Sequence, residues 1–212
     1  MELTREAFER RLEHCRQHLE FFFETRPDPS DGFRAVELGT GWFPTVPVGL
    51  YLSGATEVWT FDIASLLSPA RLRKMLDRFK EYDRTGELRK FLPRYQPERM
   101  AKLREVSEQA ERCSPDALLK QINIHFRVQD ACETGLEPGI VDLFVSTAVL
   151  EYIPYPVLKS ILLEFKRTSS PQAVQSHYIN LRDQYSYFDP KITPFNYLQY
   201  PAPKWRYFNS PL

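Results

Sequence analysis

Residues 33–41 read FRAVELGTG, an apolar run that ends in the turn Gly39-Thr40-Gly41. A short apolar run bounded by a turn is typical of a strand buried in a parallel sheet. Glycines directly after such a strand permit positive φ angles and let a ligand approach the backbone closely. This stretch therefore predicts a first strand whose carboxyl end borders a ligand site.

Strand and helix patterns alternate outward from this run. Further strands are predicted at residues 57–63, 122–128, 141–146 and 174–181. Helices are predicted at 4–25, 44–52 and 156–167, and the mostly helical stretch 66–121 is interpreted as an insertion that could cap a site. This alternation predicts an α/β fold, a doubly wound, mostly parallel sheet with helices on both faces. Ligands of such sheets bind outside the carboxyl ends of the strands.

The composition limits the class of protein. The chain has 212 residues, with 28 basic and 28 acidic side chains, so we expect no nucleic-acid partner, which would favour a basic excess. No apolar run approaches the roughly 18 residues of a membrane span, so no membrane partner is expected. The isolated cysteines Cys15, Cys113 and Cys132 suit a reducing compartment. We therefore expect a cytoplasmic protein.

Polar and small residues end the next three strands. Asp62 ends the second strand, about twenty residues after the glycine turn, where an acid can accept both hydroxyls of a ribose. Asp130 ends the third strand and can accept an adenine amino group, while the Ala131 N–H can donate to the ring. Ser146, at the end of the fourth strand, is small enough to let a ligand lie close. Together these strand ends predict an adenosine site.

The glycine turn separates two classes of adenosine cofactor. A dinucleotide fingerprint requires a third glycine where this chain has Pro44. Glu37, two residues before Gly39, would repel a pyrophosphate and favour a cationic or amino-bearing ligand. S-adenosylmethionine carries a sulfonium and an ammonium and has no phosphate. The charge pattern therefore favours S-adenosylmethionine over NAD.

Two motifs carry a family resemblance. Residues 36–41 resemble the E/D-x-G-x-G-x-G motif of class I S-adenosylmethionine-dependent methyltransferases, and residues 141–153 resemble their fourth-strand motif, in which D-x-x-x-S-x-x-V-L-E-H-I is common. The resemblance covers about residues 33–181 without the insertion. It implies a Rossmann-like sheet of order 3-2-1-4-5 and a methyltransferase activity. The third loop glycine is Phe43 here, and the usual C-terminal hairpin is missing or truncated, so the chain could be a fragment.

By position, the resemblance implies roles for the cofactor-binding residues. Gly39 and Gly41 would line the methionine part of the cofactor, and Glu37 would hold the turn and sense the amino end. The full predicted set is Glu37, Gly39, Thr40, Gly41, Asp62, Ile63, Asp130, Ala131 and Ser146. No metal site is expected, because His14 and His18 lie one helical turn apart without a third ligand nearby and are interpreted as helix-surface histidines.

The catalytic residues and the acceptor stay open. Methyl transfer is an in-line displacement in which positioning supplies most of the acceleration, so a general base leaves little trace in a sequence. The candidates are His177, Asp183 and Tyr185, although a strand histidine is more often a packed residue and Asp183 equally suits the start of a turn. The expected partner is a small-molecule acceptor, and a homodimer is left open.

The last part of the chain is rich in proline and aromatic residues. It either forms a wall of the acceptor pocket or packs on the sheet or at an interface. Its aromatic residues are Tyr185, Tyr187, Phe188, Phe195, Tyr197, Tyr200, Trp205, Tyr207 and Phe208. We divide the chain into an N-terminal helix at 1–30, a cofactor-binding domain at 31–190 and this segment at 191–212. A non-catalytic binding module and an NAD(P)-dependent enzyme are the alternative functions.

Overall fold

A computed structural model describes residues 2–27, 31–110, 113–201 and 203–204. Its centre is a five-stranded sheet of order β3-β2-β1-β4-β5 in which each neighbouring pair is parallel. The strands are β1 (Phe33–Leu38), β2 (Ala55–Asp62), β3 (Ile124–Val128), β4 (Val141–Thr147) and β5 (Ser169–Tyr178). The predicted fold class and strand order are confirmed.

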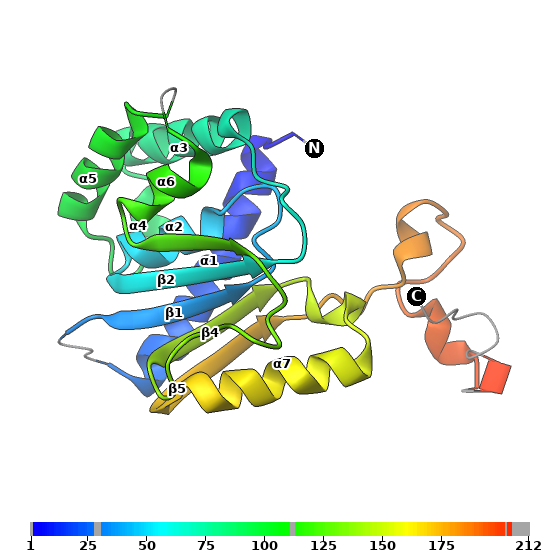
Figure 1. The fold of residues 1–212 in the computed structure, drawn as a ribbon. Coiled ribbons are helices and arrows are strands. Elements are labelled where there is room, and N and C mark those ends of the chain that lie inside the picture. Colours follow the sequence, from blue (N-terminus) through cyan, green and yellow to red (C-terminus); the bar gives the residue numbers. More distant parts are fainter. Residues whose placement is uncertain (1, 28–30, 111–112, 202, 205–212) are drawn as a thin grey trace.

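Helices cover both faces of this sheet (Figure 1). α1 (Arg5–Thr25) and α2 (Thr45–Leu52) lie on one face, and α7 (Tyr155–Thr168) lies on the other. The insertion between β2 and β3 contains α3 (Pro69–Arg84), α4 (Leu88–Phe91), α5 (Pro97–Ser107) and α6 (Pro115–Lys120). Short 3-10 helices η1 (Leu150–Tyr152), η2 (Gln184–Tyr187) and η3 (Asn196–Gln199) follow β4 and β5.

The alternation of side chains along the strands builds one core on each face. Ala35 and Leu143 belong to the cluster that packs under α1 and α2, whereas Val36 and Phe144 belong to the cluster under α7. Phe144 stacks on Phe165 of α7, with ring centroids 4.6 Å apart. Because the central strands are buried on both faces, they read as nearly continuous apolar runs in the sequence.

α1 forms where its apolar stripe predicts a helix. Thr4 caps it by accepting a hydrogen bond from the Ala7 N–H, and the predicted stripe, which includes Phe8 and Leu12, is fully buried. The interpretation of His18 as a helix-surface residue is wrong, since it is only 3% exposed and its Nδ1 lies 2.7 Å from Ser176 Oγ of β5. α1 packs broadly across β4 and β5, so positions beside the apolar stripe also face the sheet.

The insertion extends the core on the α1 face. Met75 and Phe79 of α3 and Leu103 of α5 are buried in the same cluster as Leu12. The insertion therefore covers α1 and α2 rather than the edge where the strands end, and the expectation that it caps a site is not met by the described residues. Among the described helices, none combines the length and the apolar character needed to cross a membrane.

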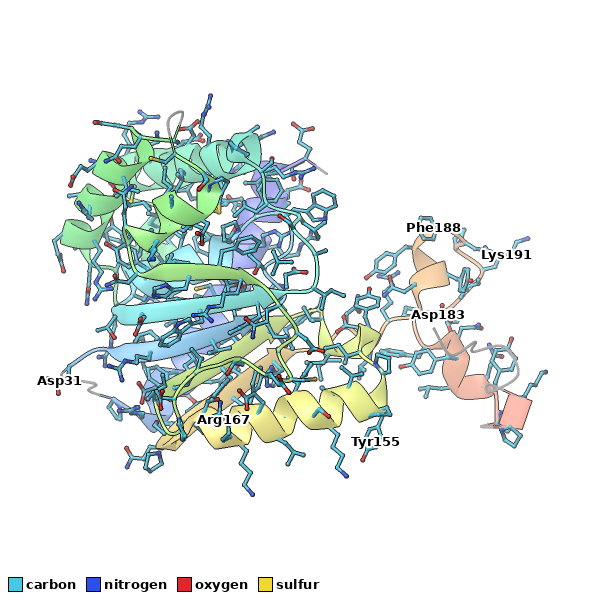
Figure 2. All side chains as sticks on the ribbon, in the orientation of Figure 1. Asp31, Tyr155, Arg167, Asp183, Phe188 and Lys191 are labelled. Atoms are coloured by element: carbon cyan, nitrogen blue, oxygen red, sulfur yellow. The ribbon has the colours of Figure 1, made fainter. Side chains whose placement is uncertain are left out.

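The segment after β5 projects from the body of the molecule (Figure 1). Figure 2 shows Asp183, Phe188 and Lys191 on this projection, and Phe188 is 87% exposed. Up to residue 201, the described part of this segment contains no sixth strand and extends away from the sheet (Figure 1), which contradicts only the alternative in which it packs on the sheet. Trp205, Tyr207 and Phe208 lie outside the described residues. The proposed domain boundaries stay a prediction.

Candidate functional site

A cavity of about 560 Å³ lies at the carboxyl ends of the strands. Its size falls within the usual range for small-molecule and cofactor sites. It extends across β1, which has β2 and β3 on one side and β4 and β5 on the other. A point where the order of the strands changes direction is the expected place for a ligand site in an open α/β sheet. Residues from α1, from the ends of β1, β2 and β4, from the loop after β3 and from the start of α7 border it.

The glycine turn after β1 forms one wall of this cavity. Gly39 has a φ angle of +87°, and a Cβ built there would lie 2.4 Å from Val149 Cγ2. Gly41 has a φ angle of +62°, and a Cβ there would meet no atom within 4 Å. The Gly39 N–H donates to the Phe61 carbonyl at 2.8 Å, which ties the turn to β2. At position 39 both the positive φ angle and the lack of room for a Cβ favour glycine, whereas at position 41 only the positive φ angle does.

Glu37 lies behind this turn and does not border the cavity. It points towards the α1 face and accepts a 2.6 Å hydrogen bond from Thr60 Oγ1, and the Thr60 hydroxyl in turn pairs with that of Thr40 at 2.5 Å. Burial raises the pKa of Glu37 to about 8, although the Thr60 hydrogen bond and Arg11 act to lower it. The Glu37 carboxyl is therefore mainly protonated at neutral pH.

This placement corrects the charge reasoning of the sequence analysis. A buried, mainly neutral Glu37 neither repels a pyrophosphate nor attracts an ammonium group directly. It does connect β1 to β2 and, through Thr60, to Thr40 of the glycine turn. The part of the predicted role in which Glu37 holds the turn therefore has a structural basis, whereas contact with the ligand has none.

Asp62 and Ile63 border the cavity at the end of β2. Asp62 Oδ2 accepts the Gly41 N–H at 2.8 Å, and Oδ1 accepts the Ala64 N–H at 3.1 Å. A carboxylate has about four acceptor positions, so both oxygens retain capacity for ligand hydroxyls. Ile63 is 87% exposed and contributes an apolar side chain to the cavity wall.

Asp130 and Ala131 border the same cavity in the loop after β3. Asp130 Oδ1 accepts the Cys132 N–H at 2.9 Å, and this hydrogen bond lowers the pKa of the Asp130 carboxyl. Ala131 is buried in the cluster under α7. The carboxylates of Asp62 and Asp130 are thus brought to one cavity from strands that are neighbours in the sheet but far apart in the sequence.

Several other predicted residues do not border this cavity. Ser146 is fully buried, and its hydroxyl pairs with His177 Nδ1 at 2.9 Å, so both belong to the packing between β4 and β5. Thr40 is buried behind the glycine turn. Asp183 caps η2 by accepting the Tyr185 N–H at 3.0 Å, and the Tyr185 side chain is 74% exposed on the projecting segment.

Sequence reasoning missed the part of the cavity wall that α1 provides. Arg10, Arg11 and His14 border the cavity, and the His14 ring lies against the Tyr178 ring with centroids 4.2 Å apart. The interpretation of His14 as a helix-surface histidine is therefore wrong. Positions 10, 11 and 14 lie together on one face of the helix, beside its apolar stripe, and this spacing was the only sequence signal that they act together. The sequence did not indicate that this face of α1 borders the cavity, because its position depends on the angle at which α1 crosses β4 and β5.

Comparisons with known proteins report only distant likenesses. No protein-family model matches the chain, and no curated protein matches it. Among solved structures it is similar to a candidate sarcosine dimethylglycine methyltransferase from Galdieria sulphuraria, with 15% identity over 88% of this chain and 54% of that chain and a TM-score of 0.47. It is also similar to a SAM-dependent methyltransferase from Aquifex aeolicus, with 13% identity over 83% and 72% of the two chains and a TM-score of 0.42.

A third similar structure is phosphoethanolamine N-methyltransferase 1 from Haemonchus contortus in complex with phosphoethanolamine and S-adenosylhomocysteine. Its identity is 12%, over 87% of this chain and 34% of that chain, with a TM-score of 0.43. The chain spans about half the length of the Galdieria protein and of a geranyl diphosphate methyltransferase, 54% and 48% respectively. At this distance the assignment of the site depends on the cavity itself.

Proposed function

We propose that this chain binds S-adenosylmethionine in the cavity at the carboxyl edge of the sheet and acts as a methyltransferase domain on a small molecule. The observation that carries the proposal is the meeting of a glycine turn, two strand-end carboxylates and an exposed isoleucine at one apolar cavity. The residues concerned are Gly39, Gly41, Asp62, Ile63, Asp130 and Ala131.

The β2 and β3 ends of the cavity suit an adenosine. Asp62 has acceptor capacity left for two ribose hydroxyls, and Asp130 has acceptor capacity left beyond its hydrogen bond to Cys132, so it could accept an adenine amino group. Ile63 offers an exposed apolar side chain, and an adenine ring packed against it would shield that surface from water. The buried backbone at Ala131 would form the floor beneath the ring.

The glycine turn suits a ligand without a pyrophosphate. A pyrophosphate needs free N–H groups at a helix N-terminus. At the start of α2, however, Pro44 and Pro47 have none, and the Thr45 N–H donates to the Phe43 carbonyl at 2.7 Å. The Gly41 N–H is already bound by the Asp62 carboxylate, whose charge would also oppose a phosphate. These contacts replace the Glu37 charge as the reason to favour S-adenosylmethionine over a dinucleotide.

The protein's part in the reaction is to position the reactants and to exclude water. Bound S-adenosylmethionine would supply a methyl group on a positively charged sulfur, which needs no further activation. Asp62 and Asp130 would hold the nucleoside, and the turn at Gly39 would let the amino-acid part lie close to the backbone. None of the three predicted catalytic candidates borders the cavity, so positioning carries the proposed rate enhancement.

Calorimetry with S-adenosylhomocysteine tests the proposal. We expect micromolar binding and no binding of NADH. In Asp130→Asn one oxygen remains for the Cys132 N–H, and the other acceptor becomes a donor, so affinity should fall roughly tenfold. Glu137→Gln is the matched control, because Glu137 is exposed and lies outside the cavity wall. Binding of NADH instead would support the dinucleotide alternative, and no nucleoside binding would support a non-catalytic module.

A further inference from the structure

The cavity is larger than its adenosine half, and α1 borders the remainder. β2 and β3 lie on one side of β1 and carry the proposed nucleoside contacts, whereas β4 and β5 lie on the other side. On that second side the wall consists of Arg10, Arg11 and His14 of α1 with residues 147–149 and Tyr152. If S-adenosylmethionine occupies the first side, this second side is where a methyl acceptor would lie.

The two arginines of this wall differ from the other arginines of α1. Arg5 pairs with Glu9 at 2.9 Å, and Arg16 pairs with Glu13 at 2.5 Å and with Glu20. Arg10 and Arg11 make no hydrogen bond or ion pair with any residue that the structure describes. Arg11 instead lies over the Phe43 ring, 6.0 Å from its centroid. The helix thus pairs its outward-facing arginines with carboxylates and leaves two cations at the cavity.

The two carboxylates that border the cavity, Asp62 and Asp130, lie at the β2 and β3 ends and accept backbone N–H groups rather than pairing with these cations. Glu37 interacts electrostatically with Arg11, but its carboxyl is buried with a raised pKa and lies behind the glycine turn. Half-burial of Arg11 strengthens its attraction for an anion, because charges that are partly removed from water interact more strongly than exposed ones. An unbalanced, partly desolvated guanidinium in a cavity wall is typical of a site for a carboxylate or phosphate.

His14 adds a polar group to the same wall. Its ring is held against Tyr178, and its Nδ1 is shielded from solvent without a hydrogen-bond partner among the described residues. Burial lowers the pKa of His14, which favours the neutral ring and leaves the positive charge of this wall to the arginines.

We propose that the face of α1 formed by Arg10, Arg11 and His14 binds the anionic group of the methyl acceptor, which is therefore a small molecule carrying a carboxylate or a phosphate. This inference rests on the proposed function, since it assigns the adenosine half of the cavity to the cofactor. The carboxylate of the cofactor's own methionine is the competing source of the same chemistry, and the two are separable by experiment.

The first experiment titrates the full chain, saturated with S-adenosylhomocysteine, with sodium acetate and separately with inorganic phosphate at constant ionic strength, following the His14 and Tyr178 ring resonances by NMR. We expect saturable shifts with at least one anion. Removing both charges in Arg10→Gln/Arg11→Gln should weaken that binding by roughly 10- to 100-fold. Arg16→Gln, on the same helix but paired away from the cavity, should bind like the wild type. Unsaturable shifts, or equal affinity in the double variant, would overturn the proposal.

The second experiment separates the two sources of carboxylate. It compares S-adenosylhomocysteine with 5′-methylthioadenosine, which has the same nucleoside and sulfur but no amino acid. If α1 binds the acceptor, the double variant should change both affinities by the same small factor. A tenfold loss for S-adenosylhomocysteine alone would assign the arginines to the cofactor and overturn the acceptor proposal. If the wild type binds neither nucleoside, the proposed function fails, and the anion titration of the unliganded chain still decides whether α1 forms an anion site.

Discussion

Replacing Gly39 by alanine should destabilise the fold through two separable effects. The φ angle of +87° places an L residue in a left-handed conformation, which costs roughly 1–2 kcal/mol. The new Cβ would also lie 2.4 Å from Val149 Cγ2 and 3.3 Å from Cγ1, and overpacking of this kind costs about 1–3 kcal/mol. We therefore expect the free energy of unfolding to fall by roughly 2–5 kcal/mol in Gly39→Ala, measured by urea denaturation.

Two further variants separate the conformational cost from the steric cost. Gly41→Ala has the conformational cost without the steric one, because its Cβ meets nothing within 4 Å, so it should lose only about 1–2 kcal/mol. In a Val149→Ala background the clash at Gly39 disappears, and a double-mutant cycle should give a coupling of roughly 1–3 kcal/mol between positions 39 and 149. Equal losses in Gly39→Ala and Gly41→Ala, together with a coupling near zero, would refute the close approach of Val149 to the turn.

Two pH-dependent predictions follow from buried acids. The folded-state pKa of Glu37 is raised to about 8, so the folded chain retains a proton that the unfolded chain loses above pH 4.5, and stability should fall as pH rises towards 8 by at most about 1.4 kcal/mol per unit. Urea denaturation at pH 6 and pH 8 should show this fall in the wild type and not in Glu37→Gln. The pKa of Glu164 is lowered to about 2, chiefly by hydrogen bonds from Arg167 and with support from Thr134, so its contribution is present above pH 4.5 and is lost as pH falls towards 2. Glu164→Gln should therefore cost roughly 2–3 kcal/mol at pH 7 and much less at pH 2, and a constant difference across this range would contradict the assignment.

The fold was predictable because its determinants are local and periodic. The apolar run that ends in Gly39 and the strand that ends in Asp62 follow from burial on both faces and from turn chemistry. The start of β5 was not predicted. The strand begins at Ser169, before Pro171, because its first residues pair with the start of β4 across an irregular register. Tertiary pairing there overrides the local signal of a proline.

The candidate site was predictable only at the strand ends. Asp62 and Asp130 reach the cavity because parallel strands deliver their carboxyl ends to one edge. Glu37 was placed wrongly because strand alternation directs its side chain to the α1 face of the sheet, where it accepts a buried hydrogen bond from Thr60. The α1 wall was missed because the angle at which a helix crosses a sheet depends on packing across the whole interface.

A crystal structure of the full chain grown with saturating S-adenosylhomocysteine tests the central claim most directly. We expect density for the nucleoside in the cavity, with the adenine against Ile63, the ribose hydroxyls within hydrogen-bond distance of Asp62 and the sulfur near the turn at Gly39. An empty cavity at saturating ligand, or the nucleoside bound elsewhere on the chain, would contradict it.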